Sequence, residues 1–441
     1  MHFIDETEHK LTLSRRDAKV VTNKIDKSVS RFLASSKFVT PNNNLPCFDR
    51  DEIVLGKLLG SGGFSHAYEL KEICPYNQNR NLAESEKHRI KLIENSKKRQ
   101  KGKAKYVVKL MKEKFLDDPR KFRHAGTDLI IEAHFLASLS HPNIISIRGL
   151  ALGGSSAYSA GANDGFFLIL DRIEETLDQR VEKWAKQMKR CKNPLFRKLN
   201  PGMIELLFLG RLQVGRDISS ALEYLHSNSL IYRDLKPGNI GFDANGVLKM
   251  IDFGLSREIS TDFKEGKGKQ IDRNGENLYD LSGKIGTQRY MAPEVGCARS
   301  YNQKADVYSL SIVLWEILSL KKPFADHSKN HHRAVVLEGT ERPPLDSEWP
   351  RDLRRLLQCG WSPMIHQRPT MRKFRSILNL EIQALGSNDK DNLSSNRSLM
   401  FLPLKDSLTT NVREEISVAD VRKEISGMTT RTGDSVGSIV P

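Results

Sequence analysis

A run of polar residues in the middle of the chain has the residue types and the order that chemistry on a polyphosphate requires. The run is Tyr232-Arg233-Asp234-Leu235-Lys236-Pro237-Gly238-Asn239, and Ile251-Asp252-Phe253-Gly254 follows it. Asp252 and Asn239 offer the hard oxygen ligands that Mg²⁺ prefers. Asp234 is suited to orient an attacking hydroxyl and to accept its proton, and Lys236 to stabilise transferring negative charge. Each residue alone could be a turn former or a surface charge, but the ordered set predicts a phosphoryl-transfer site.

A glycine-rich stretch near the start of the chain is a second candidate for phosphate contact. Gly60-Ser61-Gly62-Gly63-Phe64-Ser65 comes directly after the apolar stretch Ile53–Leu59. Glycine lets a backbone approach a ligand closely and point N–H groups at phosphate oxygens. His66–Leu70 has the pattern of a further strand, which argues against a Rossmann site because that site needs a helix here. An ordinary glycine hairpin is the alternative.

Lys109 and Glu132 each place a charge among apolar residues. Strand alternation puts Val107, Lys109 and Met111 on one face. Glu132 has the helical spacing of Leu129 and Leu136, so it projects from an apolar face, where a carboxylate needs a cationic partner. The two side chains could satisfy each other, although an exposed charge at a strand edge is the ordinary role of a lone lysine.

The elements that must position these residues change in type along the chain. The first part is rich in strand patterns and the later part in helix patterns, which predicts a β-rich lobe followed by an α-rich lobe with a cleft between them. We expect strands at Ile53–Leu59, Ala67–Leu70, Tyr106–Met111, Ile144–Leu152 and Phe166–Leu170. We expect helices at Leu129–Leu139, Pro201–His226, Ala305–Leu320 and Pro350–Cys359.

Composition excludes several classes of protein. The 441 residues are 38% apolar and carry a net charge of +16, so the chain holds enough apolar residues for a core. No apolar run is long enough for a membrane span, and MHFIDETEHKLTLSRR lacks the apolar region of a secretory signal. The five cysteines are widely spaced, which argues against a disulfide framework or a zinc site built on cysteines and favours a reducing compartment, the cytoplasm or the nucleus.

Charge and polarity divide the chain into segments. We expect residues 1–50 to be a loosely ordered polar leader and residues 385–441 a largely disordered tail, with one short helix near Val418–Ile425. Two basic segments, 71–105 and 178–200, have net charges of +7 (eleven Lys/Arg, four Glu) and +6 (eight against two). Solvated surface insertions are the simpler interpretation, and a docking patch for an acidic partner is the alternative. No nucleic-acid-binding signature accompanies them.

These motifs together resemble the eukaryotic protein kinases over about residues 51–384. The resemblance implies a bilobal α+β fold and the cofactors ATP and Mg²⁺. It makes Gly60–Ser65 the glycine-rich loop over the phosphates, Lys109 the ATP-binding lysine and Glu132 its helix partner. It makes Asp234 the catalytic base with Lys236 beside it, and Asn239 and Asp252 the metal ligands.

The same resemblance assigns several supporting residues. Ala292-Pro293-Glu294 would close the activation segment, with Arg368 as the ion-pair partner of Glu294, and Asp306 would brace the catalytic loop. Leu170, Asp171 and Ile173 resemble the gatekeeper and hinge that meet adenine. Arg233 before the base suggests control by an activation-loop phosphate, with Ser260, Thr261 and Ser282 as candidate sites.

The sequence departs from the family pattern in three places. Tyr232 stands where the family usually has His, Ser65 replaces the third glycine, and the segment 71–105 lengthens the gap between Gly60 and Lys109. Lys236 and the stretch Gly286–Met291 resemble the serine/threonine type, and Gly360-Trp361-Ser362-Pro363 resembles the tyrosine-kinase-like branch. The resemblance therefore implies a protein serine/threonine kinase. A pseudokinase scaffold, a tyrosine or dual-specificity kinase and a small-molecule kinase are the alternatives.

Overall fold

The computed structural model describes residues 13–38, 45–75, 84–100, 102–259, 264–265 and 268–387. They divide into two compact units, one within Met1–Glu174 and Ile251–Gly254 and one within Glu175–Met250 and Leu255–Pro441. The first unit is rich in strands and the second in helices, which confirms the predicted α+β, two-lobed fold class. Apart from residues 385–387, the expected tail and its short helix lie outside the described residues.

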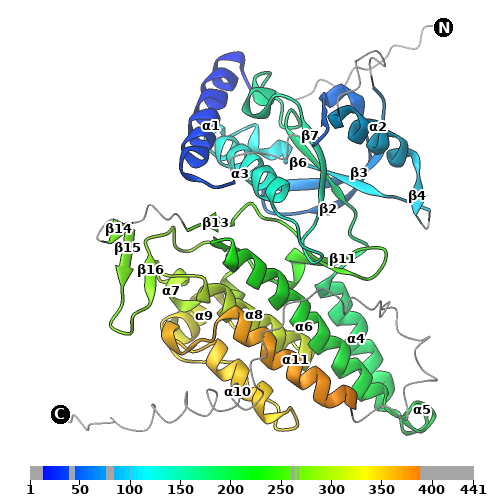
Figure 1. Ribbon diagram of the computed structural model, residues 1–441, viewed down its shortest axis with the longest axis vertical. Coiled ribbons are helices and arrows are strands. Elements are labelled where there is room, and N and C mark those ends of the chain that lie inside the picture. The colour runs from blue at the N-terminus through cyan, green and yellow to red at the C-terminus, as the bar shows by residue number, and fades with distance from the viewer. Residues whose placement is uncertain are drawn as a thin grey trace. The chain divides into compact units, whose positions relative to one another are not determined.

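The first unit is built on a six-stranded sheet with the order β1-β7-β8-β6-β3-β2 (Figure 1). Neighbouring strands are antiparallel except for β1 and β7, which run parallel. The strands are β1 (Cys47–Phe48), β2 (Ile53–Ser61), β3 (Ser65–Ile73), β6 (Tyr106–Met111), β7 (Ile147–Ala151) and β8 (Phe167–Asp171). All five predicted strands are therefore present, within a few residues at their ends.

Helix α3 (Pro119–Ser138) is longer than the helix expected at Leu129–Leu139. Asp118 caps its N-terminus, because the Asp118 carboxylate accepts hydrogen bonds from the backbone N–H groups of Arg120 and Lys121. Proline at the first helical position supports the same start, since it needs no N–H there. The first turns are mostly polar, so apolar spacing alone did not reveal them.

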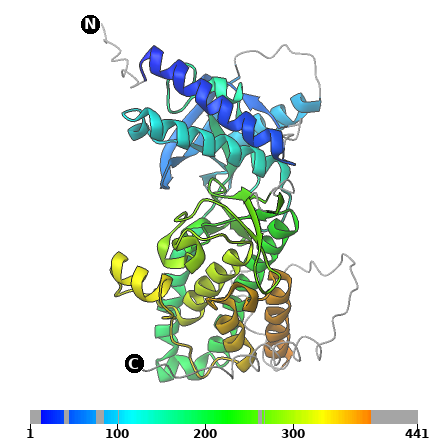
Figure 2. The same ribbon diagram turned by 90° about the vertical axis from the view of Figure 1, so that its left-hand side faces the viewer.

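Helix α1 (Arg15–Ser35) overturns the expectation of a loosely ordered leader for this part of residues 1–50. Ala18, Val21, Ile25 and Val29 recur at helical spacing and are all buried. Figures 1 and 2 show α1 lying alongside α3. The two helices approach so closely that a Cβ at Gly126 would lie 2.9 Å from Cδ1 of Ile25, so a larger residue there would displace the end of the Ile25 side chain. Residues 13–38 are therefore part of the first unit.

The basic segment 71–105 contains the end of β3, helix α2 (Glu84–Lys97) and a hairpin of β4 (Arg99–Gln100) with β5 (Lys103–Ala104). It is attached to the sheet: Oγ of Ser96 accepts a hydrogen bond from the backbone N–H of Ile73 at 3.3 Å, and the guanidinium of Arg89 pairs with Glu52. Among the described residues of the segment, the exposed basic side chains agree with a solvated insertion, and α2 and the β4–β5 hairpin give it regular structure.

The second unit consists mostly of helices. These are α4 (Leu177–Cys191), α5 (Pro194–Leu199), α6 (Met203–Ser227), α7 (Pro293–Gly296), α8 (Lys304–Ser319), α9 (Lys329–His332), α10 (Arg351–Gly360) and α11 (Met371–Ser387). Short strands join them, namely β9 (Glu175–Thr176), β10 (Leu230–Ile231), β11 (Ile240–Phe242), β12 (Leu248–Met250), β13 (Arg257–Glu258), β14 (Lys264–Glu265), β15 (Gly268–Ile271) and β16 (Asn277–Tyr279). The predicted helices at Pro201–His226, Ala305–Leu320 and Pro350–Cys359 correspond to α6, α8 and α10.

Helix α8 forms the centre of this unit, because its residues from Ala305 to Leu318 are all buried. The basic segment 178–200 is not a simple surface insertion, since it forms most of α4 and all of α5. Leu177, Val181 and Trp184 of α4 are buried, and the helix keeps its charges on the opposite face. Among the described residues, no helix is both long enough and apolar enough to span a membrane.

Candidate active site

Lys109 lies between two carboxylates in the first unit. Its Nζ is 2.8 and 2.7 Å from the two carboxylate oxygens of Glu132 and 3.0 Å from Oδ1 of Asp252. Strand β6 brings the lysine and helix α3 brings the glutamate, as the spacing of the two residues predicted. The structure therefore confirms the Lys109–Glu132 pair, and it adds Asp252 as a second partner of the same ammonium.

The charge state of Lys109 follows from its surroundings. Burial opposes the charged ammonium, but the carboxylates of Asp252 and Glu132 outweigh it and raise the pKa of Lys109. Burial also raises the pKa of Glu132, although the ammonium of Lys109 works against this. The side chain of Glu132 is only 2% exposed and that of Asp252 is 40% exposed. The paired lysine is therefore charged, and Asp252 presents its carboxylate to solvent.

The backbone at Asp252 has an uncommon conformation. Its φ of 64° lies in the left-handed region, which costs free energy for a residue other than glycine. The next residue, Phe253, is fully buried, and its N–H donates to Oε1 of Glu132 at 3.1 Å. These contacts hold the strained turn in place and aim the Asp252 carboxylate at Lys109.

Asp234 is the centre of a hydrogen-bond network in the second unit. Its Oδ2 accepts from Nζ of Lys236 at 2.7 Å and from Nδ2 of Asn239 at 2.9 Å. Its Oδ1 accepts from the backbone N–H and the hydroxyl of Thr287, at 2.9 and 2.8 Å. The amide nitrogen of Asn239 also donates to the carbonyl of Asp234, so the Asn239 amide oxygen is left as the possible metal ligand.

Thr287 is a site residue that sequence reasoning did not single out. Its hydroxyl contacts Asp234 and also accepts a hydrogen bond from Lys236 at 3.0 Å. The preceding Gly286 has a φ of 96°, and a Cβ there would lie 2.5 Å from the carbonyl oxygen of Arg233. Only glycine fits this approach, which brings Thr287 onto Asp234. The sequence indicates only that the stretch Gly286–Met291 resembles the serine/threonine type, and it predicts no contact with Asp234.

Asp306 fixes the backbone of the loop that carries Asp234. Its Oδ2 accepts from the N–H of Tyr232 and its Oδ1 from the N–H of Arg233, both at 2.9 Å, which confirms the predicted brace. The φ of Arg233 is 71°, a second strained residue next to the site. Tyr232, which stands in place of the usual histidine, is 1% exposed, so its ring fills an internal position.

Arg233 also contacts one of the candidate phosphorylation sites. Its guanidinium donates to the hydroxyl of Ser282 at 3.0 Å and to the hydroxyl of Tyr301 at 3.1 Å. The Tyr301 hydroxyl in turn donates to the Ser282 carbonyl. The other two candidates, Ser260 and Thr261, lie outside the described residues.

A buried ion pair involves Glu294, shortly after the stretch Gly286–Met291. Two nitrogens of Arg368 donate to the two carboxylate oxygens of Glu294 at 2.6 and 2.8 Å. The Arg368 side chain is fully buried and that of Glu294 is 6% exposed. This bidentate pair, predicted from the resemblance, joins α7 to the loop before α11.

The glycine-rich residues Gly60–Ser65 form the turn between β2 and β3. The N–H of Gly62 donates to the carbonyl of Ser65, which closes the turn. A Cβ at Gly60 or Gly63 would meet no atom within 4 Å, so the protein itself does not require glycine at either position. Phe64 stands 48% exposed at the tip and stacks on Phe115. The turn is open, as a loop that covers a ligand must be.

The expected hinge follows strand β8. Leu170 is buried, and Asp171 is fixed by Arg148, whose guanidinium donates to both carboxylate oxygens at 2.9 and 2.6 Å. The backbone N–H of Arg172 donates to the Lys105 carbonyl. Within the described residues, the backbone of Ile173 makes no hydrogen bond, which leaves its N–H and carbonyl for a ligand.

The site residues thus fall into two groups, one in each unit. The first unit brings together Lys109, Glu132 and Asp252, and it also carries the glycine-rich turn and the hinge. The second unit brings together Asp234, Lys236, Asn239 and the unforeseen Thr287. Each group therefore brings together side chains that the sequence assigned to the candidate site.

Comparison with known proteins places these groups in a family. The model of the protein kinase domain matches residues 93–377, which is more than half of the chain. The match includes every residue of the two groups but begins after the glycine-rich turn, so the assignment of that turn rests on its place between β2 and β3.

Curated relatives share parts of this domain. The chain is 34% identical over 184 residues to the dual specificity protein kinase shkC of Dictyostelium discoideum, over 41% of this chain and 34% of that one. It is 35% identical over 167 residues to the serine/threonine/tyrosine-protein kinase HT1 of Arabidopsis thaliana, over 38% of this chain and 39% of that one. The serine/threonine-protein kinase STY17 of Arabidopsis thaliana is 32% identical over 179 residues, 41% of this chain and 29% of that one.

The similarity to these relatives covers less than two fifths of the length of each. Their names include serine/threonine and dual-specificity kinases, which agrees with the predicted likeness to the tyrosine-kinase-like branch. The match to the family model, the two-lobed fold and the two groups of site residues lead to one conclusion. The chain belongs to the protein kinase family.

Proposed function

We propose that the chain is an active protein kinase that transfers the γ-phosphoryl group of ATP, in the presence of Mg²⁺, to serine or threonine hydroxyls of proteins. The observation that carries the proposal is the network around Asp234, where Lys236, Asn239 and Thr287 fix one carboxylate. A carboxylate that several hydrogen bonds hold in one position, next to a residue with a strained backbone, is typical of a catalytic site.

The proposed roles follow from the chemistry of each side chain. Asn239 and Asp252 are oxygen donors that suit Mg²⁺, and Lys109 is a fixed cation that suits phosphate oxygens. Bound Mg²⁺–ATP would supply the phosphoryl group and the charge that neutralises it. Asp234 would orient the acceptor hydroxyl and take up its proton at a carboxylate oxygen, while Lys236 offsets negative charge beside it.

The open turn at Gly60–Ser65 supports nucleotide binding. Packing within the protein does not require its glycines. A ligand that approaches the backbone closely would explain why glycine occupies these positions. Within the described residues the backbone of Ile173 has no hydrogen-bond partner, which supports an adenine contact at the hinge, since such a polar group gains from a partner.

Serine/threonine specificity rests on Lys236 and Thr287, which contact each other and Asp234. A dual-specificity kinase is the closest rival, because the name of the relative shkC includes that activity. A pseudokinase scaffold is the rival without catalysis. The presence of Lys109, Glu132, Asp234, Asn239 and Asp252 argues against it.

The test is phosphate transfer from radiolabelled ATP to a generic protein substrate. We expect Asp234→Ala and Asp252→Ala each to lower the rate by about 100-fold or more, whereas Asp117→Ala, at an exposed aspartate outside the site, should keep it. Circular dichroism of each variant checks that it is folded. Phosphoserine and phosphothreonine should dominate the hydrolysed product.

Two results would contradict the proposal. Absence of transfer by the wild-type chain, tested both as purified and after treatment with an activating kinase, would favour the scaffold. Phosphotyrosine in a comparable amount would favour dual specificity and leave the catalytic roles intact.

We further propose that the chain acts in the cytoplasm or nucleus. All five cysteines are free thiols, which suits a reducing compartment. An acidic docking partner would bind the basic, exposed side chains of α2, such as Lys87 and Lys91. We propose no direct nucleic-acid binding, because the sequence carries no zinc-finger, RRM or KH signature.

A further inference from the structure

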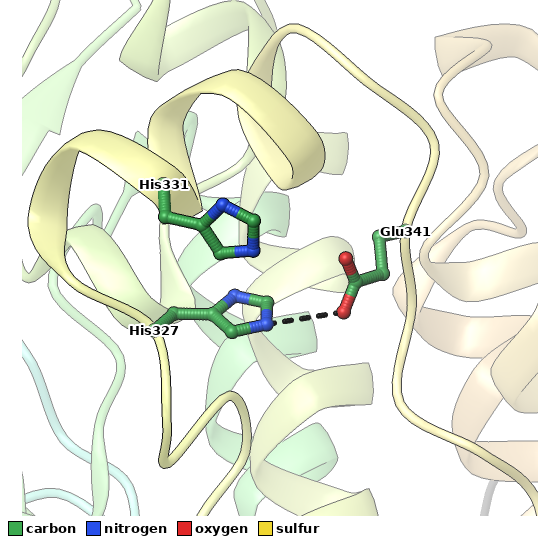
Figure 3. Close-up of side chains that lie close together, drawn as sticks. All are labelled: His327, His331 and Glu341. Carbon is green, nitrogen blue, oxygen red and sulfur yellow. Dashed lines mark ion pairs between the residues drawn. The ribbon is translucent and has the colours of Figure 1, made fainter.

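Two histidines and a glutamate, none of which has been assigned a role above, converge on the surface of the second unit. His327 precedes α9, His331 lies on α9, and Glu341 follows the π-helical turn Arg333–Leu337. One ligand atom from each lies within 4.8 Å of the other two. Figure 3 shows both imidazole rings turned toward the carboxylate of Glu341.

We propose that His327, His331 and Glu341 form a binding site for Zn²⁺. Two imidazoles and one carboxylate are a donor set that zinc favours, with the fourth position left to water. Around tetrahedral Zn²⁺ with bonds of about 2.0–2.1 Å, ligand atoms lie about 3.3 Å apart. Nε2 of His327 and Oε1 of Glu341 are already 3.1 Å apart, so only the His331 ring must move closer.

The backbone holds the three ligands in place without an ion. The hydroxyl of Ser328 accepts from the N–H of His331 at 3.2 Å, which caps α9. The N–H of Glu341 donates to the Val335 carbonyl at 2.9 Å. The rings of His327 and His331 lie edge to face with centroids 4.7 Å apart. Since the backbone at these positions is already fixed, binding costs little ordering of the main chain.

The environment also suits a cation that side chains can reach from solvent. His331 and Glu341 are exposed, and His327 is half-buried. An ion pair alone would need His327 to be protonated, and a surface pair of this kind contributes little to stability. Zn²⁺ instead binds imidazole nitrogens together with a carboxylate oxygen, so it uses all three groups.

The proposed zinc site would stabilise residues 324–331, whose backbone accepts hydrogen bonds from side chains that precede Ala292. The side-chain amide of Gln288 donates to the carbonyl of Lys329 at 2.8 Å, and Arg289 donates to the carbonyl of Phe324 at 2.6 Å. Zinc would tie the same segment to Glu341. We therefore expect slower hydrogen exchange in residues 324–341 when zinc is bound.

The test is direct zinc binding by the full chain, first stripped with a chelator and then kept in excess Mg²⁺ so that sites for hard cations are filled. Competition with a chromophoric chelator gives the affinity. We expect one Zn²⁺ per chain, and we expect His331→Ala and Glu341→Gln each to weaken binding by about tenfold or more. Both residues are exposed, so neither change should disturb folding.

A matched variant and a second signal make the result specific. His88→Ala removes an exposed histidine outside the cluster and should bind zinc as the wild type does. Co²⁺ in the same site should give the strong visible absorption of a tetrahedral ion, lost in His331→Ala. The proposal fails if the wild type does not hold zinc against the chelator, or if His331→Ala and Glu341→Gln bind as tightly as wild type. Neither readout depends on phosphate transfer.

Discussion

Individual residues in this protein show how much a buried charge depends on its partners. Lys109 has an 11% exposed side chain, and its ammonium serves two carboxylates at once. Removal of one partner from a buried ion pair costs far more than the pair itself contributes, because the remaining charge is left without compensation. Lys109 therefore has a structural role in addition to the proposed catalytic one.

We predict that Lys109→Met lowers the free energy of unfolding by about 3–5 kcal/mol at neutral pH. The difference in unfolding free energy between wild type and variant should become smaller as the pH falls toward 5. Without Lys109, burial holds the pKa of Glu132 above its unfolded value, so the folded state binds the proton more readily and is favoured at lower pH. Urea denaturation at several pH values measures both effects.

Lys114→Met is the matched control, since Lys114 is an exposed lysine in the same region. It should change stability by less than about 0.5 kcal/mol. An equal deficit in the two variants, or one that does not change with pH, would show that Lys109 does not compensate the two carboxylates.

Among the helices and strands, α1 is the most important element that the sequence did not predict. Its apolar residues follow a helical period, but they are few and separated by charges, so the segment resembles a polar leader in composition. The deciding information lies elsewhere: Gly126 on α3 leaves the space that Ile25 fills, and Phe38 packs edge to face on Phe135. A partner surface distant in sequence cannot be recognised from local spacing.

We expect Ile25→Ala to destabilise the first unit by about 2–5 kcal/mol, because Ile25 is fully buried against α3. Hydrogen exchange should increase first in α3, the helix that carries Glu132. Val20→Ala, on the same helix at a side chain that is 45% exposed, serves as the control. Equal stability of both variants would mean that α1 does not support α3.

For the whole molecule, the sequence predicted those elements and contacts that local hydrophobic patterns and ordered motifs specify. The five strands and four helices are present, Lys109 contacts Glu132, and Arg368 contacts Glu294. The missed parts depend on non-local geometry. Thr287 reaches Asp234 only because Gly286 admits a close backbone approach, and α4 buries an apolar face although its composition is strongly basic.

The sheet of the first unit also decides where the chain can be cut. Residues 93–377 match the family model, yet β1, β2 and β3 precede residue 93 and supply half of the six-stranded sheet. A fragment trimmed to that match would leave β6 as an unpaired edge and strip α1 from α3, exposing strand and apolar surface that favour aggregation. We expect residues 93–377 to elute as aggregates in size-exclusion chromatography and residues 13–387 as a monodisperse species. Monodisperse behaviour of the shorter fragment would show that the early strands are dispensable.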